Sequence, residues 1–220
     1  MKQYRIVVID DHAIFIQGLS LLIGGQRDFH VTGSATNAAA GETLIAEQKP
    51  DMAIIDLNLG DEDGLDLIKS VAEHFPETRI LVLSMLQERY YAERSLAAGA
   101  RGYVMKDAAA DTLIAAMRTV LAGKIWLSDN EQKRYIDSLF QPRAQKSPRK
   151  NPLETLSNRQ LQIFRMLGRG HSTPEMAQTL SISTKTVDAH KEQLKKKLDC
   201  ASAQELLRLA ISWNKDAPPE

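Results

Sequence analysis

Short apolar runs alternate with longer segments of helical periodicity over the first 123 residues of the chain. The apolar runs predict strands near residues 5–10, 30–35, 52–57, 79–84 and 102–106. The segments that follow them predict helices near residues 13–24, 37–48, 64–74, 89–98 and 108–122. Because strands that alternate with helices pair in parallel through right-handed crossovers, this order predicts a doubly wound α/β domain.

Five strands favour one topology of this class. We expect a flavodoxin-like parallel sheet with strand order 2-1-3-4-5, in which strands 1 and 3 flank the point where the winding reverses. Ligands of such sheets bind outside the carboxyl ends of the strands at that point. Strand 1 ends at Asp10 and Asp11, and strand 3 ends at Asp56. We therefore expect these three carboxylates to lie close together.

The last two predicted strands end in residues whose side chains carry a hydroxyl group and an ammonium group. Ser84 and Lys106 close strands 4 and 5 and should meet the carboxylates at the same edge of the sheet. A carboxylate can attack a phosphoryl group to form an acyl phosphate, and Asp56 is the candidate acceptor. Lys106 and Ser84 can then pair with the oxygens of the transferred group.

The clustered carboxylates also indicate a cation site. Three close negative charges repel one another, and an all-oxygen ligand set suits Mg²⁺. The expected ligands are Asp10, Asp11, Asp56 and the main-chain carbonyl of Asn58. The five histidines show no metal-ligand spacing, and we interpret His190 as a structural residue.

From Leu156 onward the pattern contains only helices. Capping serines precede four of them, at Ser157, Ser172, Ser183 and Ser202. The helices on either side of residues 181–183 have the spacing of a helix-turn-helix motif. In the second of them, over residues 184–198, one face should be buried. Its members are Val187, Leu194 and Leu198.

Lys185, Ala189, Glu192 and Lys196 lie nearly opposite the buried face of the 184–198 helix, and Asp188 and Lys195 flank them. With Thr186 and Lys191, these residues are the candidate DNA contacts. Lysines supply phosphate contacts, a small alanine permits close approach to base edges, and acidic side chains can accept from cytosine amino groups. A purely structural role is the alternative for the two acids. Glu192 can pair with Lys196 one turn on, and Asp188 suits the first turn of a helix.

The net charge of zero divides into two parts of opposite sign. Residues 1–142 carry 14 basic and 20 acidic side chains, whereas residues 143–220 carry 14 basic and 8 acidic ones. A basic C-terminal part indicates contact with a polyanion. The single Cys200 has no partner for an internal disulfide. We expect a cytoplasmic protein without a signal peptide or a membrane segment.

These patterns predict the organisation of the whole chain. We expect a first domain over residues 1–123 and a linker with a short helix over residues 124–152. An all-α helix-turn-helix domain should follow over residues 153–214, and a disordered tail over residues 215–220.

The residues at the strand ends resemble the signature of response-regulator receiver domains, with Asp10–Asp11, Asp56, Ser84 and Lys106 at its five positions. This resemblance implies phosphorylation of Asp56 by a partner histidine kinase, with Mg²⁺ as the only cofactor. It also implies that Tyr103 is an aromatic switch residue, which turns inward as Ser84 moves toward the phosphoryl group. The chain departs from the family after the acceptor, where a proline is usual and residues 59–64 read Leu-Gly-Asp-Glu-Asp-Gly.

The C-terminal helices resemble the LuxR-type DNA-binding domain. The matching motifs include Leu156–Gln160, Glu175–Ala177, Lys185–Val187 and Lys197–Leu198. Gln160 stands where that family usually has glutamate, which weakens an internal salt bridge. Together the two parts resemble the NarL/FixJ class of response regulators.

This class membership implies double-stranded DNA as a partner and a homodimer on phosphorylation or on DNA, with residues 205–210 as the dimer surface. It further implies that the receiver covers the recognition helix in the off state. We expect no enzyme activity beyond self-catalysed phosphoryl acceptance and dephosphorylation at Asp56.

Other functions remain open at this point. An aspartate-nucleophile phosphatase also uses carboxylates and Mg²⁺ on an α/β sheet, but it needs an Asp-x-Asp pair and Asp10 and Asp11 are adjacent. We also consider a regulator that acts without DNA, and a constitutive DNA binder with an unused acidic pocket.

Overall fold

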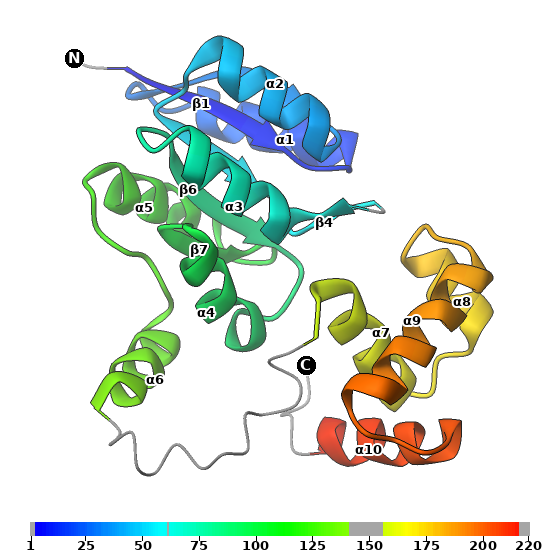
Figure 1. The fold of residues 1–220 in the computed structure, drawn as a ribbon. Coiled ribbons are helices and arrows are strands. Elements are labelled where there is room, and N and C mark those ends of the chain that lie inside the picture. Colours follow the sequence, from blue (N-terminus) through cyan, green and yellow to red (C-terminus); the bar gives the residue numbers. More distant parts are fainter. Residues whose placement is uncertain (1–2, 61, 141–155, 216–220) are drawn as a thin grey trace. The chain divides into compact units, whose positions relative to one another are not determined.

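The structure is a computed structural model that describes residues 3–60, 62–140 and 156–215. The chain divides into two compact units, residues 1–140 and residues 141–220 (Figure 1). We call them the first unit and the second unit. Residues 141–152 of the predicted linker and residues 216–220 of the predicted tail lie outside the described residues, whereas Lys215, predicted to begin the tail, is the last residue of a helix.

A five-stranded parallel sheet forms the centre of the first unit. Its strands are β1 (Tyr4–Ile9), β2 (Phe29–Ala35), β3 (Met52–Ile55), β6 (Arg79–Ser84) and β7 (Gly102–Met105). Their spatial order is β2-β1-β3-β6-β7, which confirms the predicted flavodoxin-like topology. The central strands β1 and β3 are buried on both faces, since helices cover the sheet from both sides.

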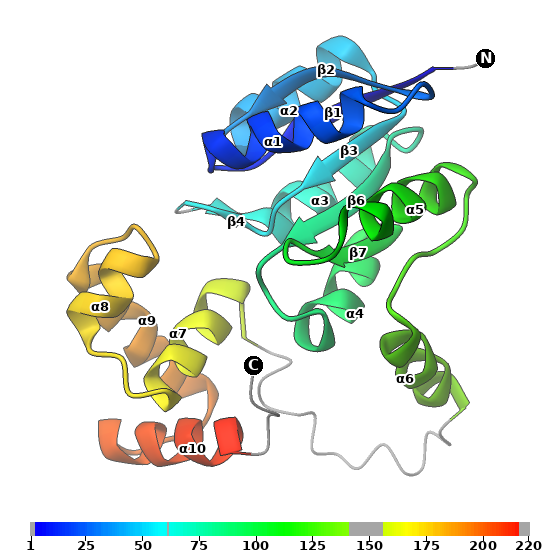
Figure 2. The same cartoon turned by 180° about the vertical axis from the view of Figure 1, so that it is seen from behind.

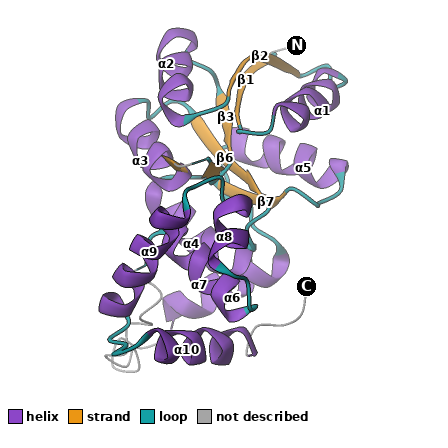
Figure 3. Cartoon of the chain, turned by 90° about the vertical axis from the view of Figure 1, so that its right-hand side faces the viewer, coloured by secondary structure: helices purple, strands orange, loops and turns teal. Residues whose placement is uncertain are grey.

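Helices pack on both faces of this sheet (Figures 2 and 3). Those on one face are α1 (Ala13–Gly24) and α5 (Ala110–Leu121), and those on the other are α2 (Ala38–Gln48), α3 (Gly64–His74) and α4 (Glu88–Ala98). Apolar side chains of α1 and α5, such as Ile16 and Met117, join the strand residues in one buried cluster. The predicted helix bounds agree with these bounds to within two residues.

A short hairpin follows β3, where the sequence pattern indicated only a loop. Strands β4 (Asn58–Leu59) and β5 (Glu62–Asp63) pair antiparallel. Gly60 has a φ angle of 64°, a left-handed conformation that glycine adopts without the penalty of a side chain. Strands of two residues are too short to show the alternation by which a sequence reveals them.

The start of the predicted linker belongs to the first unit. Trp126 forms a parallel bridge with Gly102 at the edge of β7. Helix α6 (Asp129–Phe140) follows, and the main-chain N–H of Ser128 donates to Glu88 in α4 at 2.8 Å. Residues 124–127 therefore extend the sheet edge.

Gly64 opens α3 directly against the segment that carries Asp56. A Cβ atom at Gly64 would lie 2.4 Å from the main-chain oxygen of Asp56 and 2.6 Å from Cα of Leu57. We expect Gly64→Ala to lower the free energy of unfolding by about 1–3 kcal/mol, because backbone must move. Urea unfolding of the full chain measures this change.

Gly18 provides the matched control for that substitution. It lies inside α1, and a Cβ atom added there would have no neighbour within 4 Å, so Gly18→Ala should raise stability by about 0.5–1 kcal/mol. A Gly64→Ala variant at least as stable as the unsubstituted chain would contradict the close approach.

Over residues 156–215, the described part of the second unit, the chain forms the helices α7 (Asn158–Gly168), α8 (Thr173–Thr179), α9 (Thr184–Lys197) and α10 (Ala203–Lys215). Each predicted serine cap is in place. The hydroxyl groups of Ser157, Ser172, Ser183 and Ser202 accept from the N–H group three residues on. Helices α8 and α9 are joined at Ser181, which has a φ angle of 53°.

Candidate functional site

The carboxyl ends of the sheet strands bring the predicted pocket residues together. Lys106 Nζ lies 2.7 Å from Asp56 Oδ2 and 2.6 Å from Asp10 Oδ2. Ser84 Oγ donates to Asp56 Oδ1 at 2.6 Å, and the main-chain N–H of Asn58 donates to the same oxygen at 3.1 Å. Asp56 and Asp10 are 3% and 2% exposed. Both oxygens of Asp56 are thus fixed in a buried pocket at the strand ends.

The ammonium group of Lys106 balances the negative charge of Asp10 and Asp56 in this pocket. Its side chain is buried, which by itself would lower its pKa, but the carboxylates of Asp56 and Asp10 outweigh burial and raise the pKa of Lys106. Its Nζ atom also lies 4.4 Å from the centre of the Phe15 ring. Lys106 therefore carries its charge at neutral pH.

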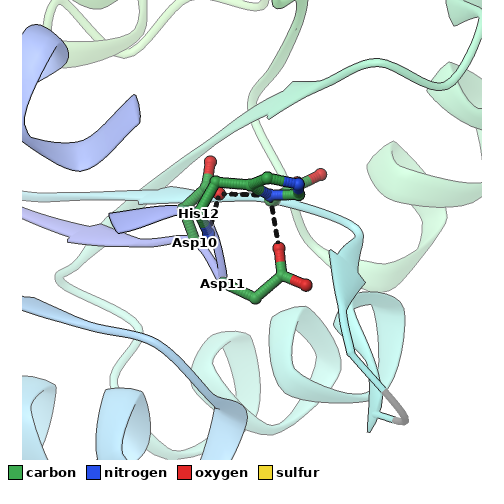
Figure 4. A group of neighbouring side chains, drawn as sticks. Asp10, Asp11 and His12 are labelled. Atoms are coloured by element: carbon green, nitrogen blue, oxygen red, sulfur yellow. Dashed lines mark hydrogen bonds and ion pairs between the residues drawn. The ribbon is translucent and has the colours of Figure 1, made fainter. Parts of the chain in front are cut away.

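Asp11 and His12 form the outer side of the pocket (Figure 4). His12 Nδ1 lies 2.7 Å from Asp11 Oδ1 and 3.2 Å from Asp10 Oδ1. Asp11 Oδ1 is buried, and among the described residues it has no hydrogen-bond partner of good geometry. Asp11 Oδ2 accepts from the main-chain N–H of Gly60 at 3.1 Å.

His12 is a pocket residue that the sequence pattern did not reveal. One ligand atom from each of Asp10, Asp11, His12 and Asp56 lies within 4.8 Å of the others. The histidines alone show no metal-ligand spacing, whereas His12 joins the carboxylates because it directly follows Asp11. A histidine next to an acidic pair at a strand end is the signal that could have found it.

Tyr103 lies behind the pocket and is 1% exposed. Its hydroxyl donates to the carbonyl of Leu86 at 2.6 Å, and the N–H of Leu86 donates to Ser84 Oγ at 3.4 Å. Burial raises the pKa of Tyr103 well above its usual value, with Tyr91 and Asp56 adding to the effect. A chain of contacts therefore leads from Asp56 through Ser84 and Leu86 to Tyr103.

The raised pKa of Tyr103 predicts a loss of stability in alkali. An unfolded tyrosine titrates near pH 10, so above that pH the unfolded state loses a proton that folded Tyr103 keeps. The free energy of unfolding should therefore fall above about pH 10, with Tyr103 contributing up to about 1.4 kcal/mol per pH unit. Tyr103→Phe should flatten the profile, as measured by urea unfolding at several pH values. Equal slopes for both proteins would contradict this.

Helix α9 exposes most of the predicted DNA contacts. Lys185, Thr186, Asp188, Ala189, Glu192 and Lys196 are exposed, whereas Lys191 and Lys195 are partly buried. The face predicted to be buried is buried, because Val187 and Leu194 are both 0% exposed. Lys185 in the first turn and Lys196 near the end of the helix are therefore exposed within the second unit.

The acidic residues of α9 pair within the helix, but not all as expected. Glu192 lies 2.7 Å from Lys195, so the predicted pair with Lys196 is wrong. Both spacings, three and four residues, bring side chains together on a helix surface. In the structure Lys195 is partly buried and Lys196 is exposed to solvent. Lys191 Nζ lies 3.8 Å from Asp188 and donates to Thr173 of α8 at 3.1 Å.

Gln160 and His190 support this helix from behind. Gln160 is buried, and its Oε1 accepts from Lys197 Nζ at 2.8 Å while its Nε2 donates to Gln193 at 2.8 Å. A hydrogen bond from the Lys197 ammonium group to an uncharged amide thus stands where a glutamate would form a salt bridge. Burial lowers the pKa of His190, and Arg159 adds to this effect, so His190 is uncharged at neutral pH.

Comparisons with known proteins agree with both sites. Residues 6–118 match the response regulator receiver domain family, and residues 154–210 match the family of bacterial regulatory proteins of the luxR type. The oxygen regulatory protein NreC of Staphylococcus haemolyticus is 33% identical over 209 residues, which span 94% of this chain and 96% of NreC. The chain belongs to the LuxR family of two-component response regulators.

The solved structures that resemble this chain include response regulators as well. A LuxR-family response regulator from Aurantimonas sp. SI85-9A1 matches with a TM-score of 0.59 and 28% identity, over 63% of this chain and 99% of that one. RcsB of Salmonella enterica serovar Typhimurium, solved bound to promoter rprA in the presence of phosphomimetic BeF3−, matches over 96% of this chain and 99% of its own. With a TM-score of 0.61 and 24% identity, RcsB shows the shared fold.

This response regulator is a DNA-binding protein of a two-component system, as predicted. The alternative of a regulator that acts without DNA is therefore wrong, because a LuxR-type DNA-binding domain follows the receiver domain. Of the helices that the structure describes, none combines the length and the hydropathy that crossing a membrane requires.

Proposed function

We propose that this response regulator accepts a phosphoryl group on Asp56 from its partner histidine kinase and that phosphorylation switches its binding to DNA. The observation that carries the proposal is the placement of Asp56, whose two carboxylate oxygens contact Ser84 and Lys106 in a buried pocket at the strand ends. An ammonium and a hydroxyl group in these positions can pair with the oxygens of a transferred phosphoryl group.

The pocket residues fit a magnesium ion. The carboxylates of Asp10, Asp11 and Asp56 lie in one cluster with His12, and we assign the main-chain carbonyl of Asn58 as a further ligand, because hard oxygens are the ligands that Mg²⁺ prefers. Asp11 Oδ1 is buried and lies 2.7 Å from His12 Nδ1, so a cation bound there would have to replace this contact. When bound, Mg²⁺ neutralises negative charge on the phosphoryl oxygens.

The residues of the chain have distinct roles in the transfer. An oxygen of Asp56 attacks phosphorus, the bond from phosphorus to the donor imidazole breaks, and the leaving imidazole takes a proton. Lys106 and Ser84 exchange their contacts with Asp56 for contacts with phosphoryl oxygens. Attack of water on the same phosphorus later restores Asp56. The chain thus catalyses only its own phosphorylation and dephosphorylation.

The contacts that link the pocket to Tyr103 support a conformational switch of the receiver domain. Ser84 is bonded to Asp56 and is linked through Leu86 to Tyr103, which already points inward. A phosphoryl group on Asp56 draws Ser84 toward it, and the Leu86 segment and Tyr103 follow. This movement shifts a pre-existing equilibrium of the receiver.

The second unit carries the DNA-binding function that phosphorylation regulates. We propose that the receiver covers α9 in the off state and that phosphorylation frees α9 to bind DNA in the cytoplasm. Opposite net charges of the two parts of the sequence favour the covered state. Helix α10, with Leu209 and Ile211 exposed at 38% and 39%, provides an apolar surface for a homodimer on two half-sites.

The experiment is a DNA-binding titration with and without phosphoramidate and Mg²⁺. A duplex first selected from a random pool by the phosphorylated protein serves as the ligand. We expect at least about tenfold tighter binding after phosphorylation, a gain of about 1.4 kcal/mol, and no change for Asp56→Asn. An equal response of Asp56→Asn to phosphoramidate would refute the acceptor assignment.

The exposed Lys196 predicts a specific salt dependence. As a phosphate contact, it should contribute about one unit to the slope of log affinity against log salt concentration. Lys196→Ala should lower the slope by that amount and weaken binding to all sequences alike. The control is Lys69→Ala, an exposed lysine on α3 of the first unit, which should leave the slope unchanged. An unchanged slope for Lys196→Ala would remove Lys196 from the contact set.

A further inference from the structure

Helix α9 carries two acidic side chains on its exposed face. Asp188 and Glu192 lie four positions apart, which places them one turn apart on the same side of the helix. Their side chains are 63% and 64% exposed. Because the phosphates of DNA repel carboxylates, an acidic side chain on a helix that binds DNA requires either a structural role or a role in recognition.

Glu192 has a structural role. Its carboxylate lies 2.7 Å from Lys195 Nζ, in a direct ion pair along the helix. Such pairs between residues three or four positions apart stabilise a helix. A Glu192 side chain that contacted a base edge would first have to leave this pair, so Glu192 is the weaker candidate for base recognition.

The structure gives Asp188 no comparable role among the described residues. Lys191 Nζ lies 3.8 Å from Asp188, beyond hydrogen-bond distance, and donates to Thr173 of α8 instead. The first turn of α9, where an acidic side chain would interact with the helix dipole, holds no acidic residue, because the helix begins at Thr184. The side chain of Ser183 already caps this helix. The alternative of a first-turn role for Asp188 is therefore wrong.

Asp188 instead lies where a helix-turn-helix motif reads bases. The N-terminal residues of the second helix of such a motif contact base edges in the major groove. Asp188 is the fifth residue of α9, and Glu192 lies one turn farther from the N-terminus. On either side of Asp188, Val187 is buried inside the second unit, whereas Ala189 is exposed and small, which lets the helix approach the groove closely.

A carboxylate in this place can distinguish cytosine from the other bases. Cytosine presents an amino donor in the major groove, whereas guanine presents two acceptors and thymine presents an acceptor and a methyl group. Adenine presents its amino donor beside the acceptor N7, which repels a carboxylate. We infer that Asp188 is a specificity-determining residue, which accepts a hydrogen bond from the amino group of a cytosine in the DNA site. This inference rests on the part of the proposed function that places α9 on DNA, and not on the phosphorylation of Asp56.

Asparagine has the shape of aspartate but reads a different base. Its amide oxygen accepts from N6 of adenine while its amide nitrogen donates to N7. Asp188→Asn should therefore replace the preference for cytosine by a preference for adenine, and Asp188→Ala should lose the preference. A mismatched base pair typically costs about 5–150-fold in affinity.

The test is a selection of duplexes from a random pool by the full chain, with and without phosphoramidate and Mg²⁺. The position read by Asp188 is the one at which the sequences selected by the unsubstituted chain and by Asp188→Asn differ. In titrations, the unsubstituted chain should bind the duplex with cytosine there at least about fivefold more tightly than the duplex with adenine. Asp188→Asn should show the reverse order, and Asp188→Ala should bind both duplexes within about twofold.

Glu192→Gln is the matched control, because it neutralises the other acidic side chain and should leave the preference for cytosine unchanged. The inference is overturned if Asp188→Asn selects the same sequence as the unsubstituted chain, or if Glu192→Gln shifts the preference as Asp188→Asn does. If the unsubstituted chain selects no sequence, the inference and the placement of α9 on DNA both fail. If Lys196→Ala lowers the salt slope while the Asp188 variants select the unchanged sequence, α9 binds DNA and only this inference fails.

Discussion

Substitution of Lys106 by methionine should lower the free energy of unfolding by about 3–5 kcal/mol at neutral pH in the absence of divalent cations. The reason is that Lys106 is the ammonium group within 3 Å of both Asp10 and Asp56, at 2.6 and 2.7 Å. Its removal leaves two buried carboxylates facing each other without that charge. Urea unfolding in the presence of EDTA measures the loss.

Two further observations separate this effect from a packing defect. Added Mg²⁺ should restore part of the stability of Lys106→Met, because a cation can replace the lost charge. The matched control Lys69→Met changes an exposed lysine and should stay within about 0.5 kcal/mol of the unsubstituted chain. The same unfolding midpoint for Lys106→Met and the unsubstituted chain would contradict the balance of charges described for the pocket.

Substitution of Asp56 by asparagine should abolish acyl-phosphate formation. An amide is not a nucleophile toward phosphorus, while its oxygen still accepts from Ser84 and its shape preserves the packing of the buried side chain. Incubation with ³²P-labelled phosphoramidate and Mg²⁺ should give no label that hydroxylamine releases. The free energy of unfolding should not fall, since one of three close negative charges is gone.

Asp66→Asn is the control for that loss of labelling. Asp66 is an exposed carboxylate in the first turn of α3 and should leave labelling intact. If Asp56→Asn carried as much hydroxylamine-sensitive label as Asp66→Asn, the acceptor would be another carboxylate of the pocket.

Much of the fold could be predicted from the sequence, because the features involved are local or periodic. Buried parallel strands appear as continuous apolar runs, so the sheet order followed from five such runs alternating with helices. Serine caps marked the helix starts of the second unit, and each hydroxyl accepts the expected hydrogen bond. Because the carboxyl ends of parallel strands meet at one edge of a sheet, the strand positions alone predicted that Asp10, Asp56 and Lys106 lie together.

The features that were missed depend on contacts between distant segments. The β4–β5 hairpin has strands of two residues. Its hydrogen bonds, between Gly60 and Asp11 and between Glu62 and Ala38, join segments that are far apart in the sequence. Trp126 completes the edge of β7 through main-chain hydrogen bonds that no side-chain pattern encodes. Glu192 had two lysines within reach in the sequence, and it pairs with Lys195.

The phosphoryl group itself can be located by chemical reduction. Borohydride reduces an aspartyl phosphate to homoserine, which mass spectrometry finds in the peptide map. After treatment with phosphoramidate and Mg²⁺, we expect homoserine at residue 56 and at no other position. Homoserine at Asp10 or Asp11, or a labelled chain with aspartate unchanged at residue 56, would contradict the assignment of Asp56 as the acceptor.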